Sequence, residues 1–290
     1  MGLPSRGLSG RPGKRQQEAP PMAIRIGVQL HPQHCTYDEL ITAVKASDQL
    51  GVDSLWTWDH FYPLYGEPDA PNQEAPVTTS PHRGAHFEAW TLLTSMACHT
   101  THAEVGLLVG CNSYRNPQLL ADMARTVDHI SGGRLILGIG SGWFERDYAE
   151  FGYEFGTAPG RLKDLAKNLP LIKERLGKLN PAPLRAIPIM IGGGGEKVTL
   201  KLVAQHATMW NGFGPPDNFA HKNQILTQWC KDLGRDPAEV ERSVLVMRPN
   251  ELDSLDDFVA AGAQHIILGL GWPFPISAVE KLVAWKKSRA

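Results

Sequence analysis

Eight short apolar runs, each followed by a segment with helical periodicity, constrain the fold of this chain most strongly. The runs are residues 24–30, 52–58, 105–109, 135–139, 189–191, 207–210, 243–247 and 265–270. Apolar residues at helical spacing follow in 37–50, 87–100, 117–130, 144–151, 161–176, 197–206, 219–233, 254–261 and 276–287. Strands that alternate with helices in this number predict a single closed (β/α)8 TIM barrel. A doubly wound open sheet is the alternative, and it usually has fewer repeats.

Two stretches depart from this alternation. Residues 61–86 follow the second strand, are rich in Pro, Asn, Gln and Thr, and show no periodicity, so we expect an insertion there. Residues 1–21 place four basic side chains among Gly, Pro, Ser and Gln without an apolar segment. We expect this part to be a disordered extension or a start-site artefact, and residues 22–290 to form the barrel.

Composition argues against several classes of partner. The 29 basic and 30 acidic side chains nearly cancel, which favours neither nucleic acid nor an anionic membrane surface. No apolar run approaches the ~18 residues that a membrane-spanning helix needs. The four cysteines are scattered without CxxC spacing, as in a cytoplasmic protein with reduced thiols.

The ends of the strands are where a barrel carries its chemistry. Asp59 and His60 lie just past the second strand. His60 is the best candidate for proton transfer, because an unperturbed histidine titrates near neutral pH. We expect Asp59 to point to the opposite face, where it fixes the loop or orients a nearby donor. The alternative is that both residues only cap the strand through backbone hydrogen bonds.

Two glycine-rich segments also follow strands. In Gly138-x-Gly140-x-Gly142 the backbone can approach a planar ligand closely, although the same glycines could be required for steric reasons alone. The run Gly192 to Gly195 precedes the helical segment 197–206, whose first amides would favour an anion such as phosphate. A flexible connector is the alternative for this run.

His31 and His34 raise the possibility of a metal-dependent barrel hydrolase. Their spacing needs further ligands from other strand ends, where aromatic residues, glycines and neutral amides predominate. A pocket lining is therefore the favoured interpretation for both histidines, and we expect no metal site.

Four stretches together resemble the luciferase-like flavin and deazaflavin oxidoreductases, most closely the actinobacterial branch that depends on coenzyme F420. They are DSLWTWDH (residues 53–60), YRNP (114–117), SGGRLILGIGSGW (131–143) and IGGGG (191–195) with Trp210-Asn211. The resemblance covers residues 24–270. Relatives that use FMN share the SGGR and glycine-rich patterns, so FMN is the alternative cofactor.

The resemblance implies a homodimer that binds F420 at the carboxyl ends of the barrel strands. It also implies a bulge with a non-proline cis peptide near Leu108-Val109, behind the deazaflavin ring. Cofactor contacts are implied for Leu108, Val109, Cys111, Asn112, Gly140, Ser141, Gly142, Trp143, Gly192, Gly193, Gly194, Trp210 and Asn211, the glycine run and Asn211 being on the phosphate side.

The same resemblance implies catalytic roles for His60 and Asp59, which match an Asp-His pair used for proton handling in sugar-phosphate dehydrogenases. Those enzymes carry a glutamate acid where this chain has Trp143, so we expect a different, apolar or conjugated substrate. The expected activity is hydride transfer between F420 and a small organic molecule. An FMN-dependent monooxygenase, the metal-dependent hydrolase and a cofactor carrier without catalysis are the alternatives.

Overall fold

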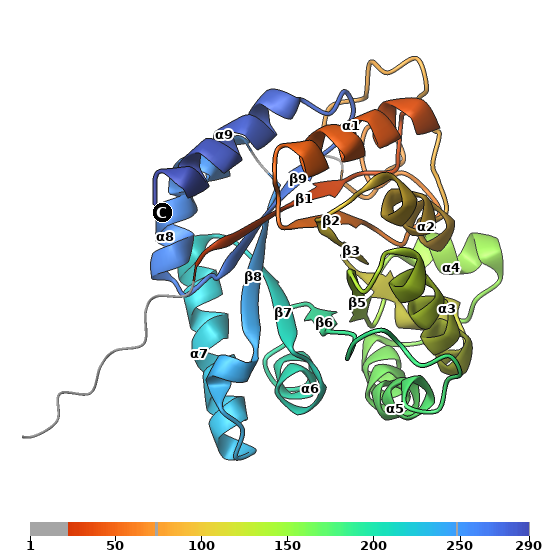
Figure 1. The fold of residues 1–290 in the computed structure, drawn as a ribbon. Coiled ribbons are helices and arrows are strands. Elements are labelled where there is room, and N and C mark those ends of the chain that lie inside the picture. Colours follow the sequence, from red (N-terminus) through yellow and green to blue (C-terminus); the bar gives the residue numbers. More distant parts are fainter. Residues whose placement is uncertain (1–22, 73–74, 248, 290) are drawn as a thin grey trace, which may run out of the picture.

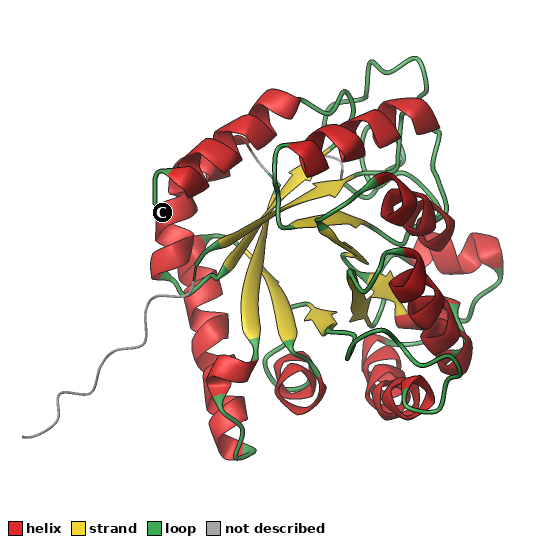
Figure 2. Ribbon diagram, in the orientation of Figure 1, coloured by secondary structure: helices red, strands yellow, loops and turns green. Residues whose placement is uncertain are grey.

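The computed structural model describes residues 23–72, 75–247 and 249–289, and these form a closed barrel of parallel strands surrounded by helices (Figures 1 and 2). The strands are β1 (Arg25–Leu30), β2 (Ser54–Thr57), β3 (Glu104–Leu107), β4 (Gly110–Cys111), β5 (Leu135–Gly140), β6 (Ile189–Gly192), β7 (Met209–Phe213), β8 (Glu241–Val246) and β9 (His265–Leu270). Their order is β3-β2-β1-β9-β8-β7-β6-β5-β4, and pairing of β3 with β5 closes the ring. The predicted TIM barrel is confirmed.

The one difference in strand count concerns the predicted strand 105–109. In the structure this predicted strand is two strands, β3 and β4. Both pair with β5, and the break between them falls at Leu108-Val109. The peptide bond between these two residues is cis, as the resemblance implies. The barrel therefore contains nine strands, because β3 and β4 together take the place of one of the eight predicted strands.

The helices lie outside the sheet, as the red ribbons around the yellow strands in Figure 2 show. They are α1 (Tyr37–Gln49), α2 (Ala89–His99), α3 (Pro117–Ile130), α4 (Glu145–Phe151), α5 (Ala158–Leu176), α6 (Thr199–His206), α7 (Pro216–Asp232), α8 (Leu255–Ala260) and α9 (Ile276–Lys287), with short 3-10 turns at Asn112–Tyr114, Pro237–Glu239 and Pro249–Ser254. The helices α5 and α7 begin three residues before the predicted ranges, because proline is tolerated in a first helical turn.

Apolar side chains fill the barrel itself, so it is a packed core up to its mouth. The interior cluster comprises Trp56, Leu108, Ile136, Met190, Met209, Leu245 and Ile267. A second, larger cluster lies between the strands and the helices. Burial on both faces explains why the strands appear in the sequence as nearly continuous apolar runs.

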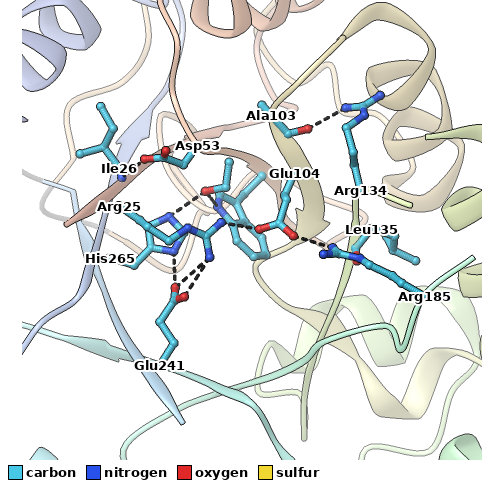
Figure 3. Close-up of polar contacts among 12 residues, drawn as sticks. Arg25, Ile26, Asp53, Ala103, Glu104, Arg134, Leu135, Arg185, Glu241 and His265 are labelled. Atoms are coloured by element: carbon cyan, nitrogen blue, oxygen red, sulfur yellow. Dashed lines mark hydrogen bonds and ion pairs between the residues drawn. The ribbon is translucent and has the colours of Figure 1, made fainter. Parts of the chain in front are cut away.

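A polar network closes the amino-terminal end of the barrel (Figure 3). Arg25 of β1 forms ion pairs with Glu104 of β3 and Glu241 of β8. The His265 ring lies 2.7 Å from Glu241 through Nδ1 and 2.8 Å from the Ser54 hydroxyl through Nε2. Although Ser, His and Glu form a line here, Ser54 and His265 are fully buried, so the arrangement joins strands and offers no access to a substrate.

The SGGR turn before β5 has a structural explanation. The Arg134 guanidinium donates hydrogen bonds to the carbonyl oxygens of Ala97, Thr100, Ala103 and Ser131 at distances from 2.6 to 3.1 Å. The last carbonyls of α2 have no partner within the helix, and Arg134 supplies one. The turn therefore fixes α2 against β5.

The predicted insertion after the second strand is present and is attached to the loop between β1 and α1. Gln33 bridges to His86, and the His34 amide donates to the Ala85 carbonyl. The Tyr65 carbonyl lies 2.6 Å from His34 Nε2 and accepts from Gln33 Nε2 at 3.2 Å. The insertion thereby lies along the rim of the barrel where β1 and β2 end.

The expected disordered extension at 1–21 lies outside the described residues. Within the described ranges, every helix is too short or too polar to cross a lipid bilayer.

Replacement of Arg134 by alanine should leave the carboxyl end of α2 without partners for its carbonyls. We expect the free energy of unfolding to fall by about 3 kcal/mol, since hydrogen bonds from charged donors are the strong ones. Urea denaturation measures this change. Lys178→Ala, which removes one exposed ion pair with Glu174, is the control and should cost under about 0.5 kcal/mol. Equal midpoints for the two variants would contradict the assigned role.

Candidate functional site

His60, whose side chain is 12% exposed, and the buried Asp147 form a pair at the carboxyl ends of the strands. His60 follows β2, and its Nδ1 lies 2.7 Å from Oδ2 of Asp147, which α4 provides. Asp147 is completely buried and also accepts from the Tyr114 hydroxyl at 3.0 Å and the Phe61 amide at 3.0 Å. With Nδ1 facing a carboxylate, Nε2 is the ring nitrogen that remains for proton transfer.

Sequence reasoning missed Asp147. The pair joins positions 87 residues apart, and no spacing rule connects a strand end with a residue in the helix after a later strand. The available signal is position: Asp147 lies in the first turn of the helix that follows the glycine-rich strand β5, close to the same end of the barrel.

Asp59 has different partners from His60. Its carboxylate receives two hydrogen bonds from the Arg115 guanidinium, at 2.5 and 3.0 Å, and one from the Cys111 amide at 2.9 Å. Asp59 therefore holds the segment that follows β4 and does not bond to His60. These contacts favour the loop-fixing role over a direct part in proton transfer.

Val109 explains several of the glycines at the mouth. A Cβ at Gly140 would lie 2.8 Å from Val109 Cγ2, and one at Gly192 would lie 3.0 Å from Cγ1. At Gly138 a Cβ would lie 1.8 Å from the Leu107 carbonyl oxygen. These glycines are required because the strand with the cis peptide packs directly against β5 and β6. The steric interpretation of the glycine-rich strand is thus sufficient for them.

Gly142 is also required by packing. Its φ is +81°, and a Cβ there would lie 2.0 Å from the Tyr148 hydroxyl and 2.6 Å from Cys111 Sγ. Cys111 itself is buried 3.2 Å from that hydroxyl. Asn112 is buried as well and accepts from Asn168 at 3.2 Å. The Cys111 and Asn112 side chains therefore contact α4 and α5.

Gly193 and Gly194 have more space around them. Gly193 has φ +115°, and the nearest atom to a Cβ at Gly194 would be Lys222 Cε at 3.6 Å. The helix expected from Lys197 begins at Thr199 instead, and its first turn has no side-chain cap. Open backbone before uncapped amides suits an anion.

Trp210 and Asn211 are adjacent residues within β7, and their side chains face opposite ways. Trp210 is fully buried, stacks on Phe219 of α7 at 5.0 Å, and donates from Nε1 to the Gly193 carbonyl at 2.9 Å. Its side chain thus holds the glycine run from the helix layer. Asn211, whose amide donates to Ser243 at 3.1 Å, takes the alternate face of the strand.

Aromatic rings surround His60. Trp143 follows β5 with Ser141 and is 57% exposed, and its ring centroid lies 5.6 Å from that of His60. Trp58 lies at 6.1 Å and Phe144 at 5.7 Å. His60 thus has an apolar environment on several sides, as in sites that exclude water.

A separate cavity of about 770 Å³ lies beside the mouth, between residues 112–116 and the first half of α5. Arg161, Asn168 and Asn112 are among its lining residues, and neither His60 nor the glycine run belongs to it.

His31 and His34 have partners within the protein. His31 stacks on Trp58 at 4.2 Å and places Nδ1 2.6 Å from the Tyr65 hydroxyl. His34 bonds to the Tyr65 carbonyl and the Gly84 amide. Within the ranges that the structure describes, no three His, Cys, Asp or Glu side chains are grouped for a metal. Burial lowers the pKa of His31 to about 3, which keeps its ring neutral.

A family model described as luciferase-like monooxygenase matches residues 22–249 of the chain. The chain belongs to this family. The resemblance that the four sequence stretches carry is therefore confirmed. In this luciferase-like protein, Asp59-His60, the YRNP segment, residues 141–143 and residues 193–195 all follow barrel strands, whereas the SGGR turn precedes β5.

Two curated relatives are enzymes from actinobacteria. An F420-dependent glucose-6-phosphate dehydrogenase of Amycolatopsis mediterranei is 25% identical over 194 residues, which are 60% of this chain and 53% of that protein. A phthiodiolone/phenolphthiodiolone dimycocerosates ketoreductase of Mycobacterium tuberculosis is 23% identical over 222 residues, 69% of this chain and 58% of that protein. The chain thus spans little more than half the length of these relatives.

A solved structure shows the same fold over nearly the whole chain. It is an F420-dependent secondary alcohol dehydrogenase in complex with an F420-acetone adduct, with a TM-score of 0.76 and 15% identity. The match covers 91% of this chain and 98% of the other.

Substitution of Gly142 by alanine should destabilise the fold by about 2 kcal/mol or more, because the residue has a positive φ and its Cβ would meet Tyr148 and Cys111. Gly194→Ala, at a position with space for a Cβ, should change the free energy of unfolding by less than about 0.5 kcal/mol. Thermal or urea unfolding of both variants measures the difference. A stable Gly142→Ala variant would show that the packing around Cys111 and Tyr148 differs from the one described.

Proposed function

We propose that this luciferase-like protein is an oxidoreductase that transfers a hydride between coenzyme F420 and a small organic substrate. The observation that supports it best is the pair of His60 and the buried Asp147 at the strand ends, in a barrel that also has the cis peptide at Leu108-Val109. Dependence on F420 is a property of the A. mediterranei relative and of the alcohol dehydrogenase with the same fold.

The residues at the mouth fit such a cofactor. Val109 is half-buried and packs its methyl groups on Gly140 and Gly192, so it offers an apolar surface to a flat ring. The open backbone at Gly194 and the first turn of α6, which no side chain caps, offer amides to a phosphate, whereas the Gly193 amide donates to the Asn211 carbonyl at 3.1 Å. Lys222 lies next to Gly194, and its ammonium group forms an ion pair with Glu196 at 2.5 Å.

In this reaction the protein itself transfers a proton and excludes water from the site. A reduced deazaflavin, when bound, supplies the hydride. Asp147 fixes the His60 ring through Nδ1, and Nε2 then delivers a proton to the substrate oxygen during reduction, or removes one during oxidation. Tyr114 and the Phe61 amide hold Asp147 in place. Trp58 and Trp143 keep water from His60.

Trp143 supports a substrate other than a sugar phosphate. A largely exposed indole next to His60 favours contact with an apolar or conjugated molecule. We therefore propose that the activity differs from that of the glucose-6-phosphate dehydrogenases, although the protein uses the same cofactor.

We further propose a cytoplasmic homodimer. Four free cysteine thiols support a reducing compartment. Exposed Leu119 lines an apolar groove between α2 and α3 with Trp90 and Met123, which supports self-association. Light scattering on the purified protein tests the dimer, and a monomer at micromolar concentration would overturn it.

Titration of the purified protein with F420 tests the cofactor. We expect saturable binding with a dissociation constant in the low micromolar range or below, measured through deazaflavin fluorescence, and competition by reduced F420. Binding of FMN with no response to F420 would instead favour a flavin-dependent monooxygenase. Stoichiometric zinc in the purified protein would favour the hydrolase alternative.

Replacement of Asp147 by asparagine tests the proton-transfer pair. We expect kcat to fall about 100-fold because the His60 ring loses its orientation, while the dissociation constant for F420 stays unchanged. Glu145→Gln, which changes an exposed carboxylate on the same helix, is the control. Unchanged kcat in Asp147→Asn would remove the pair from the mechanism.

A further inference from the structure

Two buried polar atoms at the carboxyl end of β1, one within the strand and one just after it, have no partner within the described structure. They are Oε1 of Gln29 and Nε2 of His31. Gln29 and His31 are two residues apart, so their side chains lie on the same face of the strand. A Cβ at Gly27, on the same face, would lie 2.2 Å from Ser54 Oγ and 3.1 Å from His265 Nε2, inside the barrel. Both unpaired atoms therefore belong to the interior, near the carboxyl end where β1 stops.

The orientation of the Gln29 amide follows from its one hydrogen bond. Its Nε2 donates to the Leu108 carbonyl at 2.6 Å, the carbonyl of the cis peptide bond before Val109. Because a carbonyl accepts and cannot donate, the nitrogen must face Leu108 and the oxygen must face away. The Gln29 side chain thus presents an acceptor directly beside the bulge.

The tautomer of His31 follows from Tyr65. Burial raises the pKa of the Tyr65 phenol, so it keeps its proton, and Nδ1 of His31 is the hydrogen-bond partner of the hydroxyl at 2.6 Å. If the hydroxyl donates to Nδ1, only the N–H at Nε2 lacks a partner. The other tautomer would leave both the phenol hydrogen and the Nε2 lone pair unsatisfied. The neutral ring therefore carries its proton on Nε2, as a donor.

The His31 ring is held firmly in this position. It stacks on Trp58 and occupies space beside Gly269 and Gly271, where a Cβ would lie 3.2 Å from Nε2 and 3.5 Å from Nδ1. Met247 Cγ lies 3.5 Å from the same point at Gly269, and Met247 is 43% exposed. A flexible exposed side chain thus adjoins the buried donor at the mouth.

Unsatisfied buried groups are unusual and destabilising, and they call for an explanation. Two other buried histidines show the contrast. His265 has partners at both ring nitrogens, Ser54 and Glu241, and His34 has the Tyr65 carbonyl and the Gly84 amide. A donor and an acceptor left free on one face, at the end of the barrel that carries His60, indicate a ligand with the complementary pair.

We propose that Gln29 and His31 bind the polar edge of the ring system held in the barrel mouth, with Gln29 Oε1 accepting from a ring N–H and His31 Nε2 donating to the adjacent carbonyl. The ligand class is a cyclic imide such as a pyrimidinedione, the edge that deazaflavins and flavins share. The inference rests on the proposed function for the nature of the ring, but not on the choice between F420 and FMN.

His31→Phe tests the donor, because phenylalanine keeps the stack on Trp58 and removes Nε2. The double variant His31→Phe/Tyr65→Phe also removes the phenol that the first change leaves unpaired. We expect both variants to bind the ring at least about tenfold more weakly than the wild type, whether the titrated ligand is F420 or FMN. The melting temperature of the ligand-free double variant should not fall, since no satisfied hydrogen bond is lost without its partner.

His265→Phe is the matched control, a buried histidine with both nitrogens bonded, and it should lower the melting temperature. Unchanged affinity of the double variant for the ring would overturn this inference but not the proposed function. A buried water would then be the partner of His31 Nε2. If the wild type binds neither F420 nor FMN, the proposed function fails and this inference with it.

Discussion

The packing of Val109 against Gly140 and Gly192 is the contact on which the mouth of this barrel depends. The valine is the second residue of the cis peptide between β3 and β4. Its methyl groups take the space that side chains on β5 and β6 would otherwise fill. The same segment is held from the other side by Asp59, which binds the Cys111 amide and Arg115. Since Gln29 bonds to the Leu108 carbonyl, β1 is tied to it as well. The apolar surface and the polar groups at the mouth are thus positioned by one short segment.

Much of the fold could be predicted from the sequence, because strands buried on both faces leave apolar runs that differ visibly from helical periodicity. The break in the predicted third strand could not be derived from residues 105–109, because the apolar run is continuous there. Only the resemblance implied it. The sequence also left open why the glycine-rich strand needs its glycines. Glycine permits close approach by a ligand and by the protein alike, and only coordinates show that Val109, Tyr148 and the Leu107 carbonyl are the neighbours.

Site residues that follow a strand directly could be predicted from the sequence. Residues that belong to the site only through a hydrogen-bond partner could not. His60 was identified because it follows a strand, but its partner Asp147 lies on a helix after a later strand, beyond the reach of spacing rules. Trp210 was expected among the cofactor contacts, and it faces the helix layer because Asn211 takes the inner face. Period-two alternation along β7 could have separated these two residues. The unpaired atoms of Gln29 and His31 need a complete account of hydrogen bonds, which no sequence supplies.

A crystal structure of the protein with F420 is the most direct test of the central claim, that a flat redox ring lies in the mouth on the Val109 surface. We expect electron density for the deazaflavin against Val109, with its pyrimidinedione edge toward β1, its phosphate at Gly193 and Gly194, and His60 Nε2 facing the ring. Density for the ring in the separate cavity between residues 112–116 and α5, with the mouth closed by side chains, would contradict it.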